Sequence, residues 1–139
     1  MKISSTGQKI WAKLIGGLSG LSFGLTITES GDSAIYIGGW TDAFGITHDS
    51  DAILIKLNSN GDLEWIRLLG GAGENGIFSL LSQEDGSVVC SGDTSGYGEG
   101  NYDILLLKLT FEGALEWTKT FGTPSDDYST GIQSLPSGE

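Results

Sequence analysis

Residues 51–70 read DAILIKLNSNGDLEWIRLLG, and residues 103–122 read DILLLKLTFEGALEWTKTFG. These two stretches decide the fold, because they lie 52 positions apart and nine of their twenty positions are identical. The start of the chain follows the same pattern at an offset of 54, where Gly7 and Trp11 match Gly61 and Trp65. An internal repeat of this length indicates a repeat architecture such as a propeller.

Each repeat reads as four short strands, A to D, separated by Gly, Asn and Asp turn signals. Strand A is expected near 21–29, 76–83 and 128–135, B near 33–41 and 87–94, C near 51–58 and 102–110, and D near 8–15, 62–69 and 114–121. No segment sustains an apolar period of 3.6 residues, so essentially no helix is expected. Strand C is apolar on both faces, which suits a sheet packed between two neighbouring sheets.

The sequence therefore predicts an all-β fold of four-stranded antiparallel β-propeller blades, with about 2.5–3 blades in this chain. The expected segments are 1–17 (strands C and D, the end of a blade), 18–71 and 72–123 (full blades) and 124–139 (strand A of a further blade). Propellers typically have about four to eight blades, so a closed monomeric ring is not expected. Because unpaired strand edges invite association, the chain is predicted to be a homo-oligomer or part of a longer chain.

The composition excludes several functional classes. The 139 residues carry a net charge of −11, whereas nucleic-acid binding needs a basic face. No apolar run approaches a membrane span, and the first five residues lack the apolar core of a signal peptide. Cys90 is the only cysteine and His48 the only histidine, which removes disulfides within the chain and sites built from several of these ligands. Cys90 is expected to be a small buried apolar residue.

The repeat resembles the β-propeller repeats of bacterial and archaeal surface proteins over essentially the whole chain. The resemblance is carried by Gly70-Gly71, Asp85-Gly86, Gly92-Asp93-Thr94, the run Asp103 to Leu109, Gly113 and Trp117. It implies secreted or cell-surface arrays used for binding or as structural spacers, with no common activity. The glycine and tryptophan of the C–D hairpin also resemble blades of quinone-dependent dehydrogenases, whose cofactor machinery is not found in this sequence.

Tryptophan recurs at one place in every unit, as Trp11, Trp65 and Trp117. A residue needed for packing between blades must recur, so we interpret these three as packing residues, with sugar-binding platforms as the alternative. Trp40 has no counterpart, because Asp93 stands at the matching place. It is therefore the first candidate among the tryptophans for a ligand contact.

The connections between strands B and C, 42–51 and 95–103, are the longest and most variable segments. Loops on a rigid scaffold often carry function, and here they add Tyr97 and Tyr102 to the candidate ligand-binding residues. Asp49 and Asp51 are candidate calcium ligands, as are Glu99 and Asp103, since carboxylate oxygens suit this ion. Turn formation by Asp and Gly is the simpler interpretation of the same residues.

The C–D hairpins are predicted to have three-residue loops with Gly61 and Gly113 in the left-handed conformation. This register places Lys56 opposite Glu64 and Lys108 opposite Glu116 as exposed ion pairs.

No catalytic arrangement is evident, so the chain is predicted to be a non-enzymatic binding or structural module, without a cofactor, in a larger extracellular or cell-surface protein. One alternative is a glycan-binding propeller that uses the loop aromatics. A second is a fragment of a propeller enzyme whose catalytic residues lie elsewhere. The partner, whether protein or glycan, is left open; nucleic acid and membrane insertion are not expected.

Overall fold

The computed structural model describes residues 1–16, 20–43 and 49–135, and the regular structure within these ranges consists of β-strands. The strands are β1 (Lys2–Ile3), β2 (Lys9–Trp11), β3 (Ser22–Glu29), β4 (Ile35–Thr41), β5 (Asp51–Leu57), β6 (Leu63–Leu69), β7 (Asn75–Ser82), β8 (Val88–Thr94), β9 (Asp103–Leu109) and β10 (Leu115–Phe121). These described residues contain no helix that is long and apolar enough to cross a membrane.

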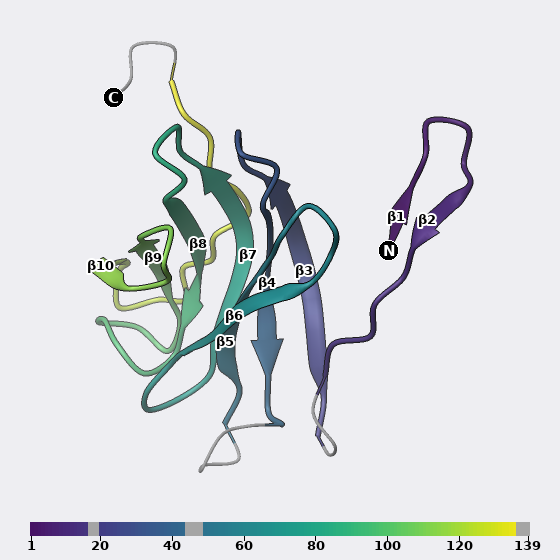
Figure 1. Cartoon of the computed structure of the whole chain (residues 1–139). Coiled ribbons are helices and arrows are strands. Elements are labelled where there is room, and N and C mark those ends of the chain that lie inside the picture. Colours follow the sequence, from purple (N-terminus) through teal and green to yellow (C-terminus); the bar gives the residue numbers. More distant parts are fainter. Residues whose placement is uncertain (17–19, 44–48, 136–139) are drawn as a thin grey trace.

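The strands form three antiparallel sheets, each a simple up-and-down meander (Figure 1). Hairpin β1–β2 stands apart from the others, β3 to β6 form one four-stranded sheet, and β7 to β10 form the second. The two larger sheets lie side by side and close no ring. The predicted all-β fold of incomplete propeller blades is thus confirmed.

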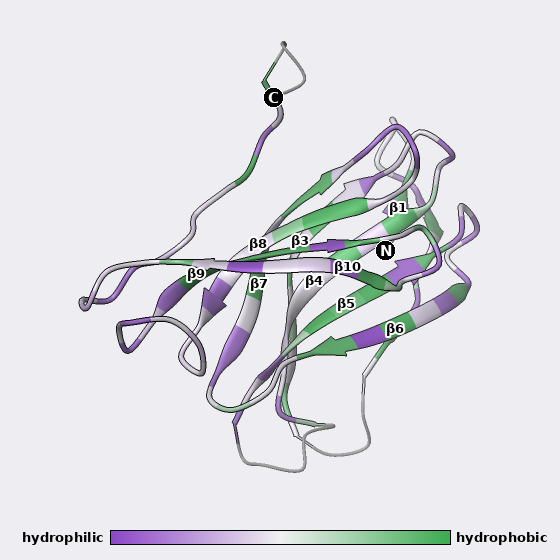
Figure 2. Ribbon diagram, turned by 90° about the vertical axis from the view of Figure 1, so that its left-hand side faces the viewer, coloured by the Kyte–Doolittle hydropathy of each residue, from purple (hydrophilic) through white to green (hydrophobic). Residues whose placement is uncertain are grey.

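Strand β5 is buried on both faces because it lies between two layers. Leu54 points into the core shared with the second large sheet. Ile53 and Ile55 point the other way, where Trp11 and Ile15 of the N-terminal segment pack against them. Apolar residues accordingly concentrate on the strands in Figure 2, and hydrophilic residues on the connecting loops. The strand that the sequence marked as apolar on both faces is therefore buried on both faces.

The core between the two large sheets joins opposite faces of equivalent blades. The first sheet contributes Tyr36 and Leu54, and the second contributes Cys90, Leu105 and Leu107. The Tyr36 hydroxyl donates to the Gly86 carbonyl across the interface at 2.8 Å. Cys90 is fully buried, as expected, and burial raises the pKa of its thiol to about 12.

The recurring tryptophans pack between blades at two of their three positions. Trp11 covers the turn of the next sheet so closely that a Cβ on Gly61 would lie 2.7 Å from its ring. Trp65 does the same over Gly113, at 3.0 Å, and its indole Nε1 donates to the Phe111 carbonyl at 3.1 Å. The packing interpretation of these two tryptophans is thus confirmed.

The C–D hairpins have the predicted loops and ion pairs, but with a different register. Gly61 and Gly113 adopt φ of +78° and +80°. Lys56 Nζ lies 3.0 Å from Glu64, and Lys108 Nζ lies 2.9 Å from Glu116.

The residue opposite each lysine is a tryptophan, Trp65 or Trp117, because a bulge places the preceding glutamate outside the ladder. The expectation of exposed pairs was wrong for Lys56, whose side chain is only 1% exposed. The turn around Phe111 of the next blade covers it: Lys56 donates to the Phe111 carbonyl at 3.2 Å.

Two expected strands differ from the structure. Residues 128–135 form no strand, which corrects the expected third strand A. This segment follows the second large sheet through isolated contacts, such as Ile132 N–H donating to Ser79 Oγ at 3.2 Å. A strand needs a ladder partner, and no strand pairs with it in the described part of the chain. The first strand D is likewise reduced to β2, because its partner β1 has only two residues.

Candidate functional site

One end of the two large sheets gathers the connections that carry polar and aromatic side chains. In an antiparallel A-B-C-D meander, strand A begins, B ends, C begins and D ends at the same edge. The B–C and D–A connections of both blades therefore meet there. Backbone hydrogen bonds hold them together: Asn75 N–H donates to the Ser50 carbonyl, and Asp127 N–H to the Tyr102 carbonyl, each at 2.8 Å.

A cavity of about 550 Å³ opens at this end. Its described lining combines aromatic rings with carboxylates and contains no lysine, arginine or histidine. The lining residues are Trp40, Asp42, Ser50, Glu74, Asn75, Gly76, Phe78, Asp93, Tyr102 and Tyr128.

Two aromatic pairs frame the cavity. Trp40, near the end of β4, stacks on Phe23 of β3 with ring centroids 4.7 Å apart and planes at 29°. Tyr102 and Tyr128 lie 5.5 Å apart at 33°. Stacking limits how each ring can turn, so the cavity presents largely pre-formed apolar walls, as small-molecule sites usually do.

The carboxylates differ in environment. Asp93, in β8, is only 8% exposed, and its Oδ1 accepts the Ser129 N–H at 2.7 Å. Burial raises the pKa of this carboxyl, and the hydrogen bond from Ser129 offsets only part of that effect. Glu74 lies on the D–A connection and accepts a hydrogen bond from the Tyr102 hydroxyl. That bond raises the pKa of Tyr102 to about 12, so this phenol stays protonated at neutral pH.

Asn75 is a positioning residue at the floor of the cavity. Its Oδ1 accepts the Thr94 hydroxyl at 2.7 Å, and its Nδ2 donates to the Gly73 carbonyl at 2.9 Å. Both ends of the amide are therefore held by the protein. The carboxylates of Asp42, Glu74 and Asp93 make the cavity rich in acceptor oxygens.

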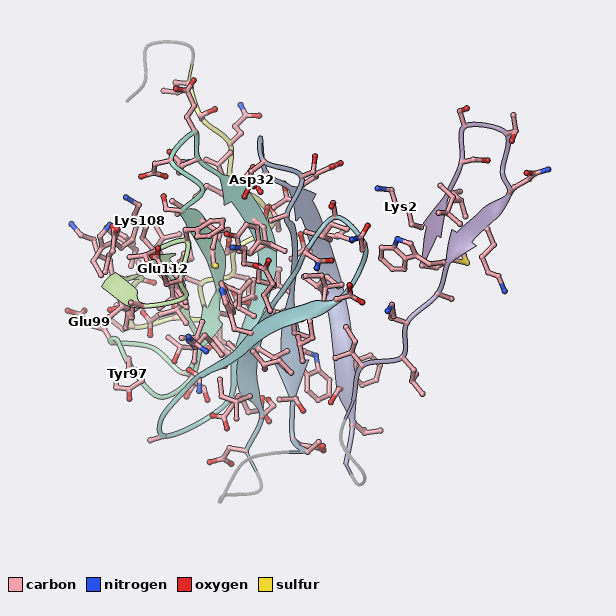
Figure 3. All side chains as sticks on the ribbon, in the orientation of Figure 1. Lys2, Asp32, Tyr97, Glu99, Lys108 and Glu112 are labelled. Carbon is pink, nitrogen blue, oxygen red and sulfur yellow. The ribbon has the colours of Figure 1, made fainter. Side chains whose placement is uncertain are left out.

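The structure brings together two of the three predicted ligand-binding aromatics. Trp40 and Tyr102 line the same cavity, whereas Tyr97 lines another, of about 460 Å³, with Leu68 and Leu115. The Tyr97 hydroxyl lies so close to Gly71 that a Cβ there would approach it to 2.0 Å. Figure 3 shows Tyr97 with Glu99 on the loop that follows β8.

Two of the candidate calcium ligands, Asp51 and Asp103, pack against a glycine of their own blade. The Asp51 carboxylate sits where a Cβ on Gly70 would be, at 2.0 Å, and Asp103 has the same relation to Gly122 at 1.9 Å. These paired glycines therefore leave room for a carboxylate that recurs in each blade. Asp49 is half-buried, and no group of three or more His, Cys, Asp or Glu side chains among the described residues could hold a metal. The calcium site remains a prediction.

Sequence reasoning missed Glu74, Phe78 and Tyr128, which reach the cavity from the β6–β7 connection, from β7 and from the segment after β10. It also missed Asp42 and Asp93. The sequence does carry a signal for Asp93: it occupies the position in the second full repeat that Trp40 occupies in the first, and the two residues differ. Positions where equivalent blades differ are better pointers to a site than positions where they agree.

Comparisons with known proteins add no family to this picture. No protein-family model matches the chain, and no curated protein matches its sequence. The resemblance to surface-protein propeller repeats therefore stays a prediction that rests on the repeat itself.

Proposed function

We propose that this chain is a non-enzymatic binding module made of β-propeller blades, and that its ligand occupies the cavity between Trp40 and Tyr128. The observation that carries the proposal is the composition of that cavity. Aromatic rings and three carboxylates face one space of about 550 Å³ at the loop end of two rigid sheets. Concave sites that combine aromatic walls with convergent polar groups commonly bind small molecules.

The ligand class follows from hydrogen-bond chemistry. Carboxylates only accept hydrogen bonds when ionised, and three of them line a cavity whose described lining has no cationic side chain. These groups favour a ligand that supplies hydrogen-bond donors and carries no negative charge. The hydroxyl groups of a neutral sugar, or the ammonium group of an amino sugar, meet both conditions, and sugar rings present an apolar face to aromatic side chains. The proposed ligand is a neutral or amino-bearing glycan.

A glycan array with the full chain tests the ligand class directly. Neutral and amino-bearing glycans are expected to bind, whereas sialylated and sulfated glycans are expected to fail because Asp42, Glu74 and Asp93 repel them. Binding restricted to acidic glycans, or binding to none at all, contradicts the proposed ligand class.

Variants locate the site. Trp40→Leu removes one wall of the cavity and should weaken glycan binding about tenfold or more, whereas Tyr97→Leu is the matched aromatic control outside the cavity and should bind like the wild type. Titration of both proteins with the best array ligand provides the comparison. Equal loss in the two variants would place the site elsewhere.

The wider setting of the module is proposed on the resemblance of the repeat. It places the chain in a larger extracellular or cell-surface protein, acting in binding or as a spacer between other parts. The alternative, a fragment of a propeller enzyme, requires catalytic residues outside the sequence considered. Display of the tagged chain on intact source cells, judged by antibody access, tests the location.

A further inference from the structure

One short motif occurs three times on the fourth strand of the repeat. It consists of a tryptophan, a cation two residues later and an apolar residue two further on: Trp11-Lys13-Ile15, Trp65-Arg67-Leu69 and Trp117-Lys119-Phe121. Alternate residues of a strand share one face, so the motifs on β6 and β10 each form a strip of three side chains. In the first motif Trp11 ends β2, and Lys13 and Ile15 follow it.

The first two strips hold the C–D turn of the following blade. Trp11 covers Gly61, and Lys13 Nζ pairs with Asp62 Oδ1 at 2.9 Å in that turn. Trp65 covers Gly113, and Arg67 binds the backbone of the same turn. Its Nε donates to the Gly113 carbonyl at 2.7 Å and its Nη2 to the Glu112 carbonyl at 3.0 Å.

The third strip has the same pattern of side chains and holds no such turn in the described ranges. Trp117 is half-buried, Lys119 is exposed, and Phe121 is 52% exposed. By strand alternation, the strip lies on the face of β10 that points away from the first large sheet.

The matching turn is also present and is also uncovered. Gly7, in the turn between β1 and β2, has φ of +80°, like Gly61 and Gly113. Its N–H donates to the Ser4 carbonyl at 3.0 Å, as Gly61 N–H does to Asn58 at 2.9 Å. Unlike the other two glycines, Gly7 has no atom within 4 Å of the place where a Cβ would stand. In Figure 3, Lys2 marks this hairpin, whose turn points away from the two sheets.

We propose that the Trp117-Lys119-Phe121 strip binds the Gly7 turn of a second copy of this chain, in a head-to-tail contact. A second copy is the proposed partner because the first two strips already bind turns of the same kind within this chain. The indole of Trp117 covers the partner turn, and Lys119 binds the carbonyls at its apex, as Arg67 does. The contact is heterologous, with a different surface on each copy, so it extends into chains or closes into a ring.

Analytical ultracentrifugation of the full chain over the micromolar range tests this contact. The wild type is expected to show a mass that rises with concentration. Lys119→Glu sets a carboxylate against the carbonyls of the turn and should weaken association about tenfold or more. Glu99→Lys, a charge reversal of the same size on the exposed B–C connection at the opposite end of this sheet, should leave association unchanged. A wild-type protein that stays monomeric at every concentration overturns the proposal.

Mixing two variants tests the head-to-tail geometry independently of folding. Lys119→Glu disables the strip and keeps the turn, whereas Thr6→Lys places a cation in the turn against Lys119 and keeps the strip. Each variant alone should stay largely monomeric, whereas an equimolar mixture should associate, because every mixed contact sets Lys119 against an intact turn or the new glutamate against the new lysine. A mixture that remains monomeric while each variant keeps the wild-type unfolding transition overturns the proposal.

Discussion

The sheets β3–β6 and β7–β10 are built from nearly the same pattern of residues, yet equivalent side chains meet different surroundings. Lys56 and Lys108 hold the same ion pair, but the first side chain is 1% exposed and the second 23%. Leu54 is fully buried, and its equivalent Leu106 is only half-buried. The difference arises because the second sheet covers one face of the first, whereas only the segment 124–135 follows the corresponding face of the second. The repeat therefore determines which residue type stands at a position, whereas the packing of adjacent sheets determines how much that residue contributes to stability.

The largest expected difference in stability is between alanine variants of Leu54 and Leu106. Leu54→Ala should destabilise the protein by about 2–5 kcal/mol, because it opens a cavity in the core between the sheets. Leu106→Ala should cost on the order of 1 kcal/mol, since that side chain gives up less buried surface. Urea denaturation of both variants measures the two losses, and equal losses would show that the two faces are covered alike.

The two lysines should differ next. Lys56→Met keeps the apolar stem but removes the charge paired with Glu64 and the hydrogen bond to the Phe111 carbonyl. We expect a loss of about 1–3 kcal/mol, typical of a buried hydrogen bond made by a charged group. Lys108→Met should change the stability little, because water screens an exposed pair. Thermal unfolding of the pair decides this, and a larger loss at Lys108 would contradict the assigned burial.

The turn glycines give a smaller, graded comparison. Gly7→Ala should cost about 1 kcal/mol, because alanine is strained at positive φ. Gly61→Ala should cost roughly 1 kcal/mol more, since its new Cβ would also press on the Trp11 ring. Chemical unfolding of the two variants provides the measurement. A Gly61 variant no less stable than the Gly7 variant would show that Trp11 does not pack on the turn.

The smallest expected effect is a difference in pH dependence between two aspartates. Burial raises the pKa of Asp93 above the ordinary 3.8, so its contribution to stability is present below that value and is lost as pH rises through the folded-state pKa. The hydrogen bond from Ser30 lowers the pKa of Asp32, so its contribution is present above 3.8 and is lost as pH falls through the folded-state pKa.

Replacement by asparagine should reveal the opposite signs. Relative to the wild type, Asp93→Asn should gain stability as pH rises from acid to neutral, whereas Asp32→Asn should lose it. Unfolding free energies measured across this range give the two slopes. Slopes of the same sign would contradict the raised pKa of Asp93 and its burial as the cause.

The candidate site could be predicted only in part from the sequence. Trp40 was recognisable because it breaks the repeat, and Tyr102 because it stands in a long connection. Glu74 and Tyr128 were not recognisable: Glu74 lies on a D–A connection that pattern analysis treats as a turn, and Tyr128 begins the segment that was expected to be the third strand A. Their relevance depends on two connections from different blades meeting at one sheet edge.

What the sequence by itself determined is local: the strands of the two complete blades, the turns between them, and that Lys56 and Lys108 each meet a glutamate across a hairpin. Strands and turns depend on alternating apolar residues and on glycines only a few positions apart, so the sequence alone is enough to locate them. Only the tertiary structure decided which faces are covered, that Glu64 lies in a bulge, that 128–135 forms no strand, and that Trp40, Glu74, Asp93 and Tyr128 share one cavity. These features arise from contacts between residues far apart in the chain, where burial changes the energy of a group without changing the pattern around it.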